Sequence, residues 1–120
     1  MVTIEGEVRL VNCSDGRIKK EYLLSGPVTR ELAGFCRDFG GVRVIEGLNK
    51  PFFTFLIADC LNIKGFIGEP TVEVWFYPAC LDAGEKFVSA LVAASESGNA
   101  DEALREEHRK LLALITGSKT

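Results

Sequence analysis

Four cysteines and a single histidine are the residues of this chain best suited to nucleophilic or acid–base chemistry. Cys80 is the strongest candidate, because it follows Pro78 and precedes a predicted helix, whose unpaired N–H groups would lower the pKa of a nearby thiol. Asp82, at the predicted N-cap, competes for the same N–H groups. The competing interpretation is a packed cysteine at a turn.

His108 follows Leu104 by four residues and precedes Leu111 by three, which places it on or beside the apolar side of a predicted helix. A partly buried histidine bonded to a neighbour explains this position without catalysis. The catalytic alternative pairs His108 as a base with Cys80 as the nucleophile. Such a pair needs hydrogen-bond reach, which no spacing in the sequence indicates.

The sequence predicts no metal site and no cofactor. Zinc sites usually draw two thiolates from each tight turn, and no C-x-x-C pair occurs here. The glycine-rich stretches 34–41 and 65–70 match neither the P-loop nor the dinucleotide fingerprint. Charged residues alternate on the predicted strands, which indicates cross-strand ion pairs on a solvated face instead of paired acid–base catalysis. These residues are Glu5, Glu7, Arg9, Lys19, Glu21, Arg43 and Glu73.

Two aromatic residues depart from this ordinary pattern. If Val72, Val74 and Phe76 point to the core, Trp75 and Tyr77 point to the opposite face of the sheet. Large aromatic side chains with polar tips are typical of a partner or ligand surface. The alternative is that the middle segment or the C-terminal helices cover them.

Composition indicates one ordinary globular domain, since 47% of the 120 residues are hydrophobic and 26% are charged. The net charge of −3 argues against a nucleic-acid partner, which would require a basic face. Residues 1–10 lack the apolar core of a signal peptide, and residues 51–63 are too few to span a bilayer. We expect a cytoplasmic protein with reduced, free cysteines and no membrane partner.

Apolar and polar residues alternate over 2–12 and 18–25, which predicts two strands joined as a hairpin at Asp15–Gly16. A helical period follows within 25–41, with Pro27 in the first turn and Gly40 at the end. Residues 42–47 form a short strand. The order of two strands, a helix and a strand indicates an α+β protein.

The segment 49–65 is apolar nearly all round and has two interpretations. Asn49 as an N-cap, Pro51 in a first turn and Gly65 beyond the end favour a buried helix. The β-branched and aromatic residues favour a strand. We expect a helix, then a turn over 65–70 and a strand over 71–77.

The C-terminal third predicts two helices that form an αα-hairpin. Start signals occur at Asp82 and Asn99, and an apolar stripe follows the first of them. Favourable i,i+4 pairs are expected in the second helix, Asp101 with Arg105 and Glu106 with Lys110. Residues 1–116 are predicted to form a single two-layer α+β domain, and 117–120 a frayed tail. Its mixed or antiparallel sheet carries the helices mainly on one face, and ferredoxin-like connections are one option.

Without a catalytic constellation, the sequence favours a non-catalytic interaction module. It would bind a protein partner, or a second copy as a homodimer, through Trp75 and Tyr77. One alternative is a thiol-dependent enzyme or sulfur-transfer protein that uses Cys80, with His108 as a base. A further alternative is a small-ligand binder with a pocket between the helices and the apolar middle segment.

Overall fold

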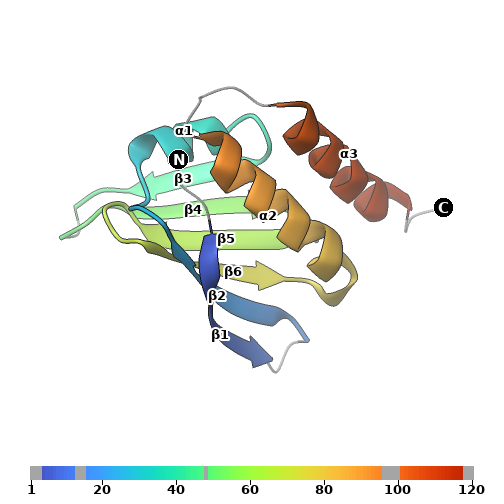
Figure 1. Ribbon diagram of the computed structural model, residues 1–120, viewed down its shortest axis with the longest axis horizontal. Helices are drawn as coiled ribbons and strands as arrows, with labels where there is room; N and C mark the ends of the chain where they lie inside the picture. Colours follow the sequence, from blue (N-terminus) through green and yellow to red (C-terminus); the bar gives the residue numbers. More distant parts are fainter. Residues whose placement is uncertain (1–3, 13–15, 48, 96–100, 118–120) are drawn as a thin grey trace.

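The computed structural model of the chain describes residues 4–12, 16–47, 49–95 and 101–117. It is an α+β domain in which three helices pack on one face of a six-stranded antiparallel sheet (Figure 1). The strands are β1 (Ile4–Asn12), β2 (Ile18–Leu24), β3 (Gly41–Ile45), β4 (Phe52–Ile57), β5 (Leu61–Phe66) and β6 (Thr71–Phe76). The three helices are α1 (Arg30–Cys36), α2 (Leu81–Ser95) and α3 (Glu102–Gly117), and a 3₁₀ turn, η1 (Pro78–Cys80), directly precedes α2.

The sheet order is β1-β2-β6-β5-β4-β3, and every neighbouring pair is antiparallel. Strands β3 to β6 follow one another as a meander, and the β1–β2 hairpin adds to its free edge at β6. The α+β class and the two-layer arrangement are therefore confirmed. The ferredoxin-like option is not confirmed.

The expected helix over 49–65 is wrong, because this segment forms the hairpin of β4 and β5. Asp59 makes the turn between the strands with a φ of 62°, a value that Asp tolerates better than most residues. Phe53, Phe55 and Ile57 point to the core, while Phe52 and Leu56 point to the other side. The segment is apolar all round because both faces of β4 carry apolar side chains.

The core lies between the sheet and the helices α1 and α2. Val72, Val74 and Phe76 of β6 are buried there, as the alternation predicts. Helix α2 approaches the sheet closely at Gly84, where an added Cβ would lie 2.8 Å from the Phe76 ring. The close approach fixes how α2 lies on β6.

The helix starts differ from the predicted ones. Helix α1 is capped by Thr29, whose Oγ1 accepts a hydrogen bond from the Leu32 N–H at 3.1 Å. Helix α2 begins directly after η1, so Asp82 lies in its first turn and is not an N-cap. The Asn99 cap lies outside the described residues. Asp101 instead accepts from the Leu104 N–H at 2.8 Å.

Helices α2 and α3 form the predicted αα-hairpin, with Leu104 and Leu111 of α3 fully buried. The ion pairs on α3 have a spacing of three residues, Glu106 with Arg109 and Glu107 with Lys110. Glu106 therefore pairs with Arg109 where Lys110 was expected. Of the helices in the described ranges, none has the length and apolar character needed to cross a membrane.

Candidate functional site

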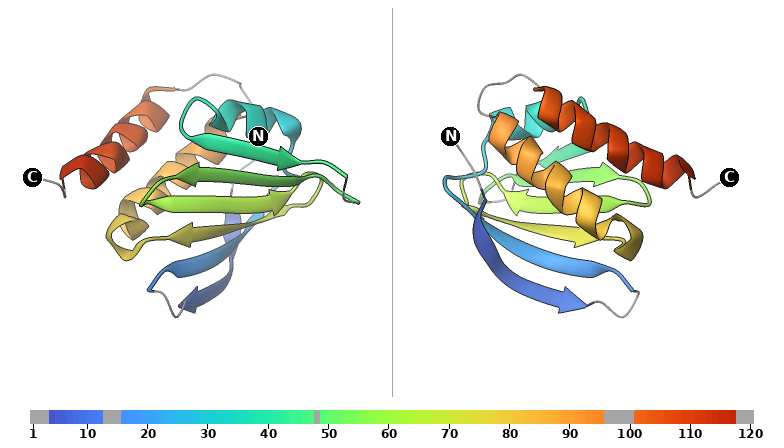
Figure 2. Two further views of the ribbon diagram at one scale, coloured as in Figure 1. Left: turned by 180° about the vertical axis from the view of Figure 1, so that it is seen from behind. Right: turned by 45° about the vertical axis from the view of Figure 1, so that its right-hand side comes forward.

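The three helices all lie on one side of the sheet, and no helix of the described chain covers the other side (Figure 2). We call this second surface the open face. Its outward side chains come from β2, β6, β5, β4 and β3, and the strand register arranges them in three rows across the sheet. The open face is the candidate functional site.

The first row is apolar and lies at one end of these strands. Phe66 is opposite Phe52, and Phe52 is opposite Ile45. The Phe52 and Phe66 rings pack at a centroid distance of 5.1 Å, and Phe66 is still 43% exposed. Ile45 and Leu23 of the same row are 44% and 40% exposed. Such a row beside polar residues is the mark of an interaction surface.

The middle row is charged, and its two ends differ in sign. Glu21 of β2 lies opposite Glu73 of β6, Glu73 lies opposite Lys64 of β5, and Arg43 of β3 closes the row. Lys19 pairs with Glu73 at 3.6 Å, which relieves part of the repulsion between the two glutamates. The row is acidic over β2 and β6 and basic over β5 and β3.

The third row contains Trp75 between Lys19 of β2 and Asn62 of β5. Three cations lie over the indole ring at 4.9 to 5.5 Å from its centroid, namely Arg17, Lys19 and Lys64. Such cation–π contacts hold the ring in place and cover part of its apolar surface. Leu56 continues the row on β4 and is 49% exposed.

Two polar atoms of this third row are buried without a hydrogen-bond partner among the described residues. They are Nε1 of Trp75, a donor, and Oδ1 of Asn62, an acceptor. A buried polar group without a hydrogen bond lowers the stability of the folded state. Tyr77, the second predicted aromatic, lies beyond the end of β6, is 43% exposed and lines a hollow with Arg17 and Pro78.

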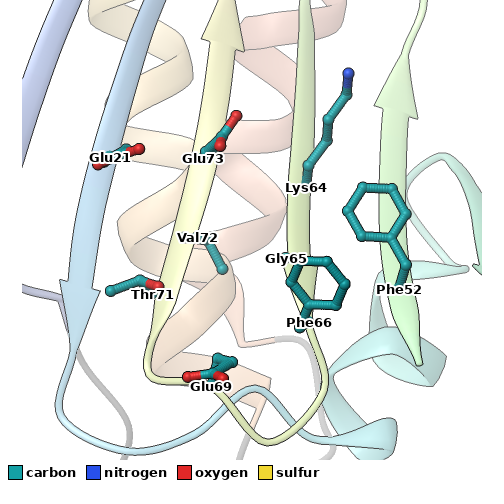
Figure 3. Close-up of a pocket in the computed structure, with 9 residues that line it drawn as sticks. All are labelled: Glu21, Phe52, Lys64, Gly65, Phe66, Glu69, Thr71, Val72 and Glu73. Atoms are coloured by element: carbon teal, nitrogen blue, oxygen red, sulfur yellow. The ribbon is translucent and has the colours of Figure 1, made fainter. Parts of the chain in front are cut away.

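A shallow pocket of about 330 Å³ joins the apolar and charged rows (Figure 3). Glu21, Glu73 and Lys64 extend from three neighbouring strands above it, and the Phe52 and Phe66 rings form one side. Glu69 closes the lower end and pairs with Lys50 at 2.5 Å. The pocket is part of the open face and not a space between the helices and the middle segment.

Cys80 is 3% exposed at the end of η1. Its side chain hydrogen bonds to Cys60, which lies nearby because the Tyr77 N–H donates to the Cys60 carbonyl at 2.9 Å. Burial, the hydrogen bond with Cys80 and the charge interaction with Cys80 all raise the pKa of Cys60. Burial also raises the pKa of Cys36 to about 12. Cys13 lies outside the described residues.

His108 packs among aromatic rings and not against a thiol. Its ring lies 5.0 Å from that of Phe39 and 5.6 Å from that of Phe87. Nε2 is buried without a hydrogen-bond partner in the described part of the chain. No hydrogen bond within the described ranges joins His108 to Cys80. Nor do the same ranges hold a cluster of three or more His, Cys, Asp or Glu side chains suited to a metal ion.

The sequence analysis missed the apolar row and Leu56, which are prominent on the open face. The helix assigned to 49–65 concealed them, since only the alternation of a strand turns Phe52 and Leu56 away from the core side of their neighbours. The turn residue Asp59 between two short runs of aromatic and β-branched residues was the available signal. Comparison of the chain with protein-family models, with curated proteins and with solved structures found no match.

Proposed function

We propose that this protein is a non-catalytic interaction module that binds a protein partner through the open face. One observation carries the proposal: large apolar side chains stand exposed on a sheet surface that no described helix covers. They are Leu23, Ile45, Leu56 and Phe66, each at least 40% exposed. Interface cores combine such residues with aromatic anchors, and Trp75 lies among them.

Charge and shape also favour a protein as the ligand. The open face carries both acidic and basic side chains instead of one uniformly basic surface, which supports a partner with its own charge pattern. Its pocket is open to solvent and has a mixed lining, with Glu21, Glu73 and Lys64 beside two aromatic rings. A small ligand usually takes a deeper, more apolar cavity.

The thiol alternative has less geometric support. Cys80 is 3% exposed and hydrogen-bonded to Cys60, and the ring of His108 contacts Phe39 and Phe87. A reactive cysteine needs an accessible thiol near a positive charge. The free thiols of Cys36, Cys60 and Cys80 support a cytoplasmic location.

Site-specific photo-crosslinking in cells tests the proposal. A photoreactive amino acid at Leu56, on the open face, should give a discrete adduct with one protein. The same amino acid at Arg109, whose side chain is 67% exposed on α3, is the matched control and should give none.

Trp75→Ser in the Leu56-labelled protein should abolish the adduct while the circular dichroism spectrum stays unchanged. Equal, diffuse labelling from both positions would contradict the proposal. So would an adduct that persists undiminished in the folded Trp75→Ser variant.

A further inference from the structure

Resting on the proposed function, we infer that the partner of the open face is a second copy of this chain, packed face to face in a two-fold homodimer. The argument depends on the order of the outward residues across the strands. An isologous interface requires a surface complementary to itself, so that each contact occurs twice.

The charged row meets this requirement. A two-fold axis parallel to the strands, between β5 and β6, exchanges the positions of these two strands across the interface. Glu73 on β6 of each copy then faces Lys64 on β5 of the other. Glu21, one strand further out on β2, faces Thr54 on β4. No carboxylate faces a carboxylate, and the Glu73–Lys64 contact of opposite charges occurs twice.

The same axis matches the apolar row with itself. Leu23 on β2 lies over Phe52 on β4 of the other copy, and Phe66 on β5 lies over the start of β6. The apolar contact of Leu23 with Phe52 therefore occurs twice at one end of the interface, while Phe66 meets Thr71. Face-to-face packing of two sheets with nearly aligned strands is a common arrangement, and it suits side chains that alternate along each strand.

The third row adds an independent observation. Trp75 of each copy lies over Asn62 of the other, because these two residues are opposite each other on β6 and β5. Trp75 carries the unpaired buried donor, and Asn62 carries the unpaired buried acceptor. Both atoms are buried within their own chain, so the third row offers the second copy the partly exposed Trp75 ring and not a polar contact.

The size of the face predicts a weak dimer. Five strands spaced about 4.8 Å apart and three rows of outward residues cover roughly 24 Å by 20 Å. Two such surfaces bury about 1,000 Å² in total, which is at the lower end for specific protein interfaces. Association should therefore be measured at chain concentrations from about 1 μM to about 1 mM.

Charge reversal with mixing tests the inference. Sedimentation of the wild-type chain should show a rise from the monomer mass toward twice that mass with concentration. Glu73→Lys and Lys64→Glu should each weaken association by about tenfold, because each replaces two attractive contacts by two repulsive ones. An equimolar mixture of the two variants should recover wild-type association, since their heterodimer restores both contacts.

Glu106→Lys, the same charge change on α3, is the control and should leave association unchanged. Thermal unfolding confirms that each variant folds, and the mixing result does not depend on charge repulsion within one chain. A wild-type chain that stays monomeric up to about 1 mM overturns the inference, as does a mixture that associates no better than its components. An adduct of Leu56 with a different protein would overturn the homodimer but leave the proposed function standing.

Discussion

At the scale of single residues, the three described thiols lie in surroundings that suppress their reactivity. Cys36 and Cys60 are 1% and 0% exposed, and burial raises the pKa of both. Cys80 is nearly as inaccessible and is hydrogen-bonded to Cys60. The sequence identified Cys80 by its place before a helix, but burial depends on the β4–β5 turn, which comes from another part of the chain.

Alkylation of the native protein near neutral pH should therefore label Cys36, Cys60 and Cys80 far more slowly than a free peptide thiol. The packed core excludes the reagent from all three thiols, and the raised pKa of Cys36 and Cys60 leaves little thiolate of these two at that pH. Mass spectrometry of each cysteine, with the denatured protein as the control, measures the difference. Rapid labelling of native Cys80, with an apparent pKa well below 8.5, would restore the thiol-enzyme alternative.

At the scale of elements, Gly84 sets the distance between α2 and the sheet. Gly84→Ala should lower the free energy of unfolding by about 1–3 kcal/mol, because the new methyl group would meet the fully buried Phe76 ring. Gly34→Ala on α1 is the matched control, since an added Cβ there meets no atom within 4 Å. This control should gain about 0.5–1 kcal/mol from helix propensity.

Chemical denaturation of both variants measures these changes. A stabilised Gly84→Ala protein would show that α2 does not pack on Phe76 as described. A destabilised Gly34→Ala protein would show that an alanine is not tolerated at an exposed position of α1, and the comparison would lose its control.

Most elements could be predicted from sequence periods, and the exceptions have a common cause. Strand β6 and the buried stripe of α2 follow simple alternation or helical spacing. Strand β4 does not, because Phe52 and Leu56 are apolar on the open side as well. An apolar outer face removes the alternation of apolar and polar residues on which a strand assignment depends. The same property hid the candidate site, so one misassignment accounts for both errors.

At the scale of the whole molecule, exposed apolar side chains occur on two separate surfaces. One is the open face, with Leu56 and Phe66, and the other is α3, with Leu112 and Leu114. The two surfaces lie on opposite sides of the sheet (Figure 2). Only the open face combines exposed apolar side chains with a tryptophan and with charged residues of both signs, which is why we assign it as the binding surface.

Because Trp75 is the only tryptophan, its fluorescence reports on the open face alone. Dilution of the wild-type protein through the concentration range over which the dimer dissociates should shift or change the tryptophan emission, since the partner chain then leaves the indole ring. The Glu73→Lys variant should already show the dilute spectrum at high concentration. Emission that is independent of concentration while the mass changes would place the dimer contact elsewhere.

Oxidative footprinting in cells is the most direct test of the binding surface. Hydroxyl radicals modify exposed Leu and Phe side chains, so the modification of each residue in cells is compared with that of the dilute purified protein. The account predicts that Leu56 and Phe66 are protected in cells, while Leu112 and Leu114 are modified equally in both samples. Protection of the α3 pair with no protection of the open face would contradict it.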